Sequence, residues 1–165
     1  MIYKVRNYLT SNCLKTVYLS LAYPHFLYGS VIWGGTFHTY LNNLFVTQKK
    51  MLRVMACRDR YAHTDPLFKH FGLLKLFDII ALQTNIFVYK SLYVTEIECN
   101  FRIIQNPQTR RQNRLQLPLH RTSHSQRYLS YRGAHQWNQL SDDIRNSNSV
   151  NVFKKKIKHM YLNRY

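Results

Sequence analysis

The chain has 165 residues, which fits one domain of ordinary size or one and a half small ones, and 45% of them are hydrophobic, so a packed core is expected and the chain is not a disordered basic tail. It carries 24 Lys and Arg residues against 7 Asp and Glu, a net charge of +17. This charge attracts polyanions, so nucleic acid is the first partner to consider, although a ribosomal or chromatin protein would show the same imbalance.

The first expected element is a helix over residues 13–33, capped by Ser11 or Asn12. Pro24 should kink or split this helix, because its ring displaces a backbone hydrogen bond, and Gly34-Gly35 should end it. Residues 16–48 contain no charged side chain, and 17–35 approach the length of a membrane span. The proline, histidine, serines and tyrosines within that stretch favour a buried core helix, and we expect no membrane partner.

A second helix is expected to begin at Thr36 or Thr39 and to run to Ala56. Its apolar residues fall on one stripe at helical spacing: Leu41, Leu44, Phe45, Leu52 and Met55. Its basic residues lie on another side and are candidates for phosphate contacts: Lys49, Lys50 and Arg53.

Two more helices follow. Asp65 and Pro66 predict a start, with the carboxylate as N-cap and the proline at the first helical position, and Gly72 predicts the end of that short helix. Residues 76–93 are apolar on nearly all sides, which predicts the central and most buried helix.

The character of the chain changes after residue 98. A polar, basic arm follows, in which "RLQLPL" (114–119) and "RYLSY" (127–131) alternate and are candidates for a two-stranded ribbon. Gly133 should break the chain before a turn of helix in "AHQWNQL", and Ser149 should cap the last helix. We therefore expect a mainly α protein, a helical bundle with a basic irregular arm, divided into a helical domain at 1–98, the arm at 99–131 and a C-terminal helical segment at 132–165.

The residues do not assemble a recognisable catalytic centre. Two-metal chemistry needs several carboxylates around the ions, and the one adjacent pair, Asp142-Asp143, fits a helix N-terminus better. No nucleophile, phosphate-loop or metalloprotease motif is present, and the three cysteines lack zinc-site spacing. We expect no catalytic residue, metal, cofactor or small-molecule substrate. The cysteines are expected to be free thiols in a reducing compartment, the nucleus or the cytoplasm. The first residues lack the apolar core of a signal peptide, which agrees with that location.

Candidate nucleic-acid contacts lie in the arm and in the last helix. Arginines bind phosphate in a bidentate manner, and the arm contributes Arg110, Arg111, Arg114, Arg121 and Arg127. Tyr128, Tyr131 and Trp137 are candidates for stacking on unpaired bases, although docking onto the core is the better interpretation of Trp137. On the last helix one stripe should pack inward while another side is basic. The inward residues are Val150, Phe153, Ile157, Met160 and Tyr161, and the basic candidates are Lys154, Lys155 and Lys158, with Lys156 pointing elsewhere. A solvated helix face is the alternative interpretation of these lysines.

Several phrases, in order, resemble one family. They are "VYLSLAYPHFLYGSVIWG" (17–34), "LFVTQKKMLRVM" (44–55), "YAHTDPLF" (61–68), "RGAHQWNQLSDDIRNS" (132–147) and "FKKKIKHMY" (153–161). The set is similar to the region that follows the polymerase core in reverse transcriptases of jockey-like non-LTR retrotransposons, over nearly the whole chain. The family's proline after tryptophan-asparagine-x-leucine is replaced by Ser141.

The resemblance implies a parent RNA-directed DNA polymerase that copies RNA at a nicked target. The family's catalytic tyrosine-x-aspartate-aspartate motif does not occur here, so the chain looks like the back of a thumb and the helical segment after it. The resemblance thus implies that the domain at 1–98 is thumb-like. The expected partner is RNA or an RNA–DNA template-primer, with a reverse transcriptase core as a second partner. The alternatives are a structural remnant that once packed on that core, and an independent RNA-binding protein.

Overall fold

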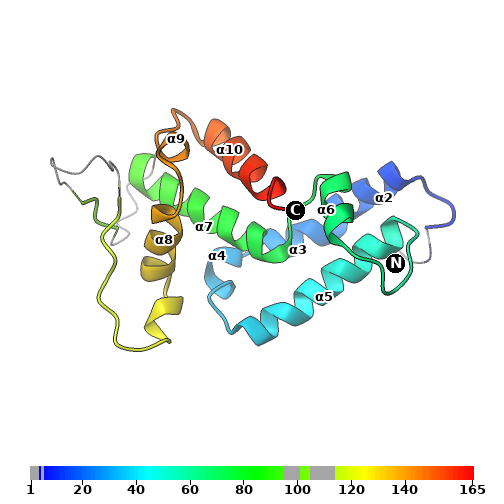
Figure 1. Ribbon diagram of the computed structural model, residues 1–165, viewed down its shortest axis with the longest axis horizontal. Coiled ribbons are helices and arrows are strands. Elements are labelled where there is room, and N and C mark those ends of the chain that lie inside the picture. Colours follow the sequence, from blue (N-terminus) through cyan, green and yellow to red (C-terminus); the bar gives the residue numbers. More distant parts are fainter. Residues whose placement is uncertain (1–3, 5, 95–100, 105–113) are drawn as a thin grey trace.

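The computed structural model describes residue 4 and residues 6–94, 101–104 and 114–165, and the predicted mainly α fold is confirmed (Figure 1). The N-terminal helices are α2 (Ser11–Val17), the π-helical turn η1 (Tyr18–Ala22), α3 (Tyr23–Leu27) and α4 (Ser30–Trp33). The predicted split at Pro24 is confirmed, because the π turn precedes the proline and Gly29, at φ 61°, separates α3 from α4. The predicted cap is displaced: Thr10 Oγ1 accepts from the Cys13 N–H at 3.4 Å, in place of Ser11 or Asn12.

Helix α5 (His38–Met55) follows the Gly34-Gly35 stop, and Phe37 is its N-cap. Leu41, Leu52 and Met55 are buried as predicted, and Phe45 packs against them. The prediction for Leu44 is wrong: its side chain is 41% exposed, because it lies at the edge of the stripe. The centre of the stripe is occupied by Gln48, a polar residue with no exposed surface.

Helix α6 (Asp65–Phe71) ends at Gly72, whose φ of 62° is the left-handed conformation that glycine favours. The N-cap is Thr64, so the prediction of Asp65 as the cap is wrong by one residue. Asp65 is the first residue of the helix and forms an ion pair of 2.9 Å with Lys75. A carboxylate in the first turn is favoured there by the helix dipole, with or without a capping role.

Helix α7 (Leu76–Tyr93) is the central helix that the sequence predicts. Helices α8 (Leu129–Asn138) and α10 (Val150–Leu162) pack against it, as do α3, α4 and α5 (Figure 1). Surrounded in this way, it buries residues on several sides: Leu76, Ile79, Ile80, Leu82, Thr84, Asn85, Ile86, Val88 and Tyr89.

The prediction that Gly133 breaks the chain is wrong, since it lies inside α8 and is buried. A Cβ on Gly133 would meet Phe101 Cζ and Val88 Cγ2, each at 3.0 Å. The glycine therefore allows α8 to approach α7 closely. After α8, the short helix α9 (Asp142–Arg145) begins with the two aspartates, as predicted, and Ser149 Oγ caps α10 by accepting from the Val152 N–H at 3.3 Å.

The arm pairs differently from the prediction. Leu115 forms one antiparallel bridge with Ile103, whereas residues 127–131 end the 3-10 turn η2 (Ser125–Arg127) and begin α8. The alternation in "RYLSY" therefore does not belong to a strand. Asn138 holds the bridge to α8, because its Oδ1 accepts from the Leu115 N–H at 2.9 Å and its Nδ2 donates to the Leu115 carbonyl at 2.8 Å.

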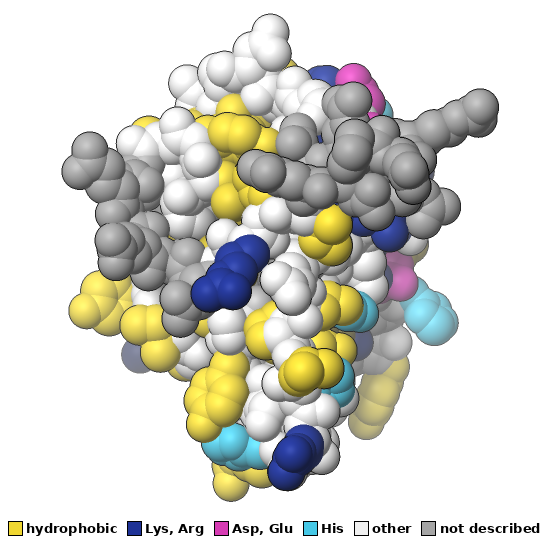
Figure 2. Space-filling model, turned by 90° about the vertical axis from the view of Figure 1, so that its left-hand side faces the viewer, with side chains coloured by type: hydrophobic (Ala, Val, Ile, Leu, Met, Phe, Trp, Pro, Cys, Tyr) yellow, Lys and Arg dark blue, Asp and Glu magenta, His cyan; other side chains and the backbone are white. Residues whose placement is uncertain are grey.

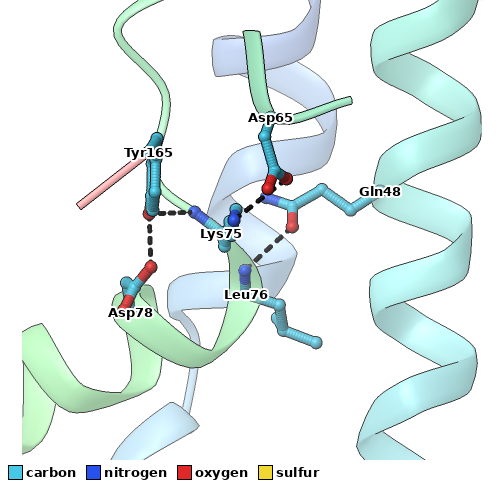
Figure 3. A network of polar contacts seen from close by, with 6 residues as sticks. All are labelled: Gln48, Asp65, Lys75, Leu76, Asp78 and Tyr165. Atoms are coloured by element: carbon cyan, nitrogen blue, oxygen red, sulfur yellow. Dashed lines mark hydrogen bonds and ion pairs between the residues drawn. The ribbon is translucent and has the colours of Figure 1, made fainter. Parts of the chain in front are cut away.

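The last residue of the chain is tied to the junction between α6 and α7 (Figure 3). The Tyr165 hydroxyl accepts from the Lys75 backbone N–H at 2.9 Å and donates to the Asp78 carboxylate. Burial raises the pKa of Asp78, while the hydrogen bond from Tyr165 and the charges of Arg164 and Lys75 oppose that rise. The network connects the end of α10 to the start of α7.

One hydrophobic cluster contains residues from α2 to α10, and the division at 98 and 131 stays a prediction. Within the described ranges no single helix is long and apolar enough to cross a membrane; by length and composition alone, only α6 and α7 together would be, and they meet at a bend of 51°. Cys13 and Cys57 are free and exposed, and Cys99 lies outside the described residues.

Candidate nucleic-acid interface

Acidic side chains in the described part of the chain are mostly engaged locally. Asp65 pairs with Lys75, Asp142 with Arg145 and Asp143 with Lys156, while Asp78 accepts from Tyr165. With 7 acids against 24 Lys and Arg in the sequence, few carboxylates remain to neutralise other basic side chains. The surface therefore keeps most of its positive charge.

The last helix presents its lysines as the periodicity predicts. Phe153, Ile157 and Tyr161 are buried against the core, and Val150 and Met160 pack beside them. The other side of the helix is exposed and carries Lys154, Lys155 and Lys158. The predicted different direction of Lys156 is confirmed by its contacts: its Nζ donates to the Asp143 carboxylate and to the Asp143 carbonyl, both at 2.9 Å.

The three basic candidates on α5 differ in their surroundings. Lys50 is exposed. Lys49 Nζ lies 4.2 Å from the centre of the Phe45 ring, a cation–π contact. Arg53 Nε donates to the Ala62 carbonyl at 2.9 Å and so holds the segment before α6. Arg53 therefore has a structural contact, and Lys50 is the one of the three with the most open position.

The arm candidates are also unlike one another. Arg110 and Arg111 lie outside the described residues. Arg114 is partly buried beside the Leu115 bridge, and Arg121 is exposed. The Arg127 guanidinium lies over the Phe37 ring, with its Cζ 3.5 Å from the ring centre.

The described candidates form three groups. In Figure 1, α5 and α10 lie on opposite sides of the layer formed by α3 and α7, and the described part of the arm, from residue 114 on, lies beside α8 at one end of the molecule. Figure 2 looks at that far end, where hydrophobic, histidine and basic side chains lie next to one another in the lower half. A ligand that contacted all three groups would have to follow the surface around α7, as an extended polymer can.

Arg132 is a partly buried cation that the sequence pattern does not single out. Its Nη2 donates to the Val31 carbonyl of α4, and within the described residues its Nε and Nη1 have no hydrogen-bond partner. Burial lowers the pKa of this guanidinium. A cavity of about 280 Å³ lies beside it, and Gly34 and Gly35 form part of the cavity wall. The signal in the sequence is the Gly34-Gly35 pair, which leaves room for the arginine: a Cβ on Gly35 would lie 3.1 Å from Arg132 Nη1.

The three predicted stacking residues have different exposures. Trp137 is fully buried, so the preference for docking is confirmed. Tyr131 is partly buried between His120 and His135, with ring centres 4.4 and 5.9 Å away. Tyr128 is 59% exposed, and it alone of the three presents most of its ring to solvent.

The site offers cations and aromatic rings, and these can bind an anionic polymer without bond-making chemistry. No group of three or more His, Cys, Asp or Glu side chains capable of holding a metal ion occurs in the part of the chain that the structure covers. No protein-family model, curated protein or solved structure matches the chain.

Proposed function

We propose that the chain binds nucleic acid mainly through contacts to phosphate groups. More particularly, it acts as the C-terminal region of a non-LTR retrotransposon reverse transcriptase, where it holds template-primer or element RNA and has no catalytic site of its own. The observation that carries the proposal is the exposed face of α10, where Lys154, Lys155 and Lys158 form no ion pair within the described residues. If acidic side chains lay beside these lysines, they would neutralise the face, and it would attract a polyanion only weakly.

The packing of the family-like phrases supports the particular form of this proposal. Gln48 of "TQKK" donates to the Tyr18 hydroxyl of "VYLSLAYPHF" at 3.0 Å. The Gly34-Gly35 pair lies against Arg132 of "RGAHQW". Separate phrases of the resemblance therefore contact one another in the folded chain.

The test removes the charges and keeps the helix. We expect a variant with Lys154, Lys155 and Lys158 all changed to Gln to bind RNA or primer-template more weakly, with little dependence on sequence. The slope of log affinity against log salt should fall in magnitude by roughly 0.7 to 0.9 for each phosphate group that the variant no longer binds. Gln keeps the helix because its propensity is close to that of Lys. Titrations at several salt concentrations measure both the affinity and the slope.

Lys156→Gln is the matched control, since Lys156 lies on the same helix but pairs with Asp143. It should leave the salt slope close to that of the wild type. Parallel slopes for the wild type and the triple variant, with helix content intact by circular dichroism, would return the three lysines to the role of a solvated face.

A second candidate function is docking onto a polymerase core, and a specific observation favours it. Tyr28, just before α4, and Ile32, within α4, are 85% and 84% exposed, so this part of the surface offers apolar area that a docked core could cover. On this view the chain is a structural remnant when its core is missing. The test adds this chain to a separate finger–palm protein and measures primer extension. Increased extension would support a joint role with the polymerase core. Salt-dependent RNA binding with no effect on extension would favour an independent RNA-binding protein.

A further inference from the structure

Exposed aromatic side chains gather where the turn between α4 and α5 meets the segment before α8. We call this surface the aromatic patch, and its members are Ile32, Phe37, Tyr40, His124, Arg127 and Tyr128. The large apolar members are well exposed: 84% for Ile32, 53% for Phe37, 66% for Tyr40 and 59% for Tyr128. All members except Tyr40 line a shallow cavity of about 240 Å³, so the patch is hollowed and not flat.

The rings of the patch hold one another in place. Phe37 and Tyr40 meet edge to face with their centres 6.3 Å apart, and His124 meets Tyr128 at 5.4 Å with an angle of 87° between the rings. Arg127 joins the two pairs, because its guanidinium lies over the Phe37 ring. Rings that are already fixed lose little conformational entropy when a flat ligand stacks on them.

The backbone beneath the patch is also fixed. A Cβ on Gly35 would lie 2.7 Å from the Arg127 carbonyl oxygen, so a glycine is needed where the two segments touch. Arg132, in the first turns of α8, donates to the Val31 carbonyl of α4 and ties the same two segments together. Residues about 90 positions apart in sequence are therefore held as one surface.

The charge around the patch is positive. The cavities that adjoin Gly35 are lined by Arg127, Arg132 and two histidines, and no acidic side chain among the described residues lines either of them. Exposed rings with an arginine between them and no carboxylate nearby suit a ligand that has flat faces and negative charge. Unpaired nucleotides have both, because every base has a face that can stack and every linkage carries a phosphate.

We propose that the aromatic patch binds unpaired bases of single-stranded nucleic acid, with bases stacked on Tyr40 and Tyr128 and a phosphate bound by Arg127. The proposal rests on the proposed function and makes it more specific: the helix α10 lysines contact phosphates of any nucleic acid, whereas the patch selects strands with exposed bases. A docked protein would be the other occupant of an apolar surface, but the excess of cations favours the polyanion.

The test separates stacking from charge. The variants are Tyr40→Ala and Tyr128→Ala, and Tyr61→Ala is the matched control because Tyr61 is 88% exposed in the loop before α6. The probes are fluorescein-labelled oligonucleotides of about 15 nucleotides, long enough to cover a typical single-strand site. One is single-stranded RNA, one is the same strand in a duplex, and one has abasic sites throughout.

We expect each patch variant to bind the single-stranded RNA about 5-fold more weakly or worse, the loss typical of removing one stacking ring. The salt slope should not change, because no charge is removed, and affinities for the duplex and the abasic strand should stay at the wild-type values. Tyr128→Phe should restore binding, because phenylalanine keeps the ring. If Tyr128→Ala disturbs the start of α8, Tyr40→Ala still carries the test, since alanine favours the helix at that exposed position of α5.

Three outcomes would overturn the inference. Wild-type affinity of both alanine variants for single-stranded RNA would remove the patch and leave the proposed function intact. An equal loss on the abasic strand would show that the rings do not act by stacking. A wild-type protein that binds none of the probes would overturn the inference and the proposed function together.

Discussion

Gln48 is the residue on which three segments of the core depend. It has no exposed surface, and all its polar atoms are used: Nε2 donates to the Tyr18 hydroxyl at 3.0 Å and to the Leu74 carbonyl at 2.9 Å, and Oε1 accepts from the Leu76 N–H at 2.8 Å (Figure 3 shows the last of these). The last bond satisfies the backbone N–H of Leu76, the first residue of α7, which has no acceptor within the helix and receives no cap from the Lys75 side chain. Burial raises the pKa of the Tyr18 phenol to about 12, so this partner stays protonated at neutral pH.

We expect Gln48→Met to lower the free energy of unfolding by roughly 3 kcal/mol, since it leaves a buried N–H and a buried carbonyl without partners. Urea denaturation followed by circular dichroism measures the loss. Asn43→Met, at an exposed position of the same helix, should cost less than about 0.5 kcal/mol. Similar losses at both positions would mean that the hydrogen bonds of Gln48 contribute little.

The helical periodicity gives no signal for this role of Gln48, because a polar residue within the apolar stripe does not reveal its partners. Its neighbours in the pattern, Leu41, Leu52 and Met55, follow from local periodicity, which needs no knowledge of the rest of the chain. The partners of Gln48 lie 26 to 30 residues away, and only the folded chain shows that they meet. The same limit applies to Phe37 and Arg127: the Arg127 Cζ lies 3.5 Å from the centre of the Phe37 ring, although the two residues are far apart in sequence.

Asp78 should make stability depend on pH in a direction opposite to that of most carboxylates. Burial raises its pKa above the ordinary value of 3.8, so folding favours the protonated form. Its contribution to stability is therefore fully present below pH 3.8 and is lost as the pH rises through the higher pKa of the folded state.

Asp78→Asn removes this titration and keeps an oxygen that accepts from the Tyr165 hydroxyl. We expect the difference in unfolding free energy, wild type minus variant, to decrease as the pH rises from acid to neutral. Urea titrations of both proteins over that range give the difference directly. A difference that increases with pH would mean that Tyr165, Arg164 and Lys75 stabilise the ionised carboxylate by more than burial disfavours it.

At the scale of the helices, local pattern predicts the elements better than their contacts. The inward stripe of α10 and the burial of α7 follow from spacing alone and are confirmed. The prediction for Gly133 is wrong because a glycine is locally a helix breaker, while its position in α8 is set by Val88 and Phe101 from elsewhere. The prediction for residues 127–131 is wrong for a similar reason, since a short alternating run fits the start of a helix as well as a strand.

Gly133 gives a prediction about how α8 packs on α7. We expect Gly133→Ala to change the free energy of unfolding by less than about 1 kcal/mol, because its better helix propensity offsets contacts that are slightly too close. Gly133→Val should cost roughly 2 kcal/mol or more, since its two further carbon atoms have no space. Thermal or urea unfolding measures both variants.

The control for this prediction is His135→Val, at an exposed position of the same helix. Histidine and valine have similar helix propensities, so this change should cost only the contact of the His135 ring with Tyr131, about 1 kcal/mol or less. If Gly133→Val lowered the free energy of unfolding by no more than His135→Val, α8 and α7 would not be in the close contact that the glycine indicates.

At the scale of the whole molecule, the charge of +17 acts on folding as well as on binding. Two like charges about 10 Å apart in water repel with about 0.4 kcal/mol, so several such pairs amount to a few kcal/mol. The repulsion is greatest in the compact folded state and is screened by salt, because the Debye length falls from about 30 Å at 0.01 M to about 8 Å at 0.15 M.

We therefore expect the free energy of unfolding to rise when sodium chloride is raised from about 0.01 M to 0.15 M, over the range where the Debye length changes most. The triple variant with Lys154, Lys155 and Lys158 changed to Gln should be more stable than the wild type at low salt and should respond less to added salt. Urea titrations at fixed pH and several sodium chloride concentrations measure both effects.

The two measurements on the triple variant belong together. If the three lysines only face solvent, their mutual repulsion lowers the stability of the folded protein and they add nothing to RNA binding. If they contact phosphates, the same repulsion lowers the stability of the free protein, and the lysines also increase its affinity for RNA. Increased stability at low salt combined with weaker RNA binding is the result that the proposed function requires. The contrary result is a triple variant that is no more stable than the wild type and whose unfolding depends on salt in the same way. It would mean that nearby charges compensate the α10 lysines, so that these lysines are not available to a polyanion.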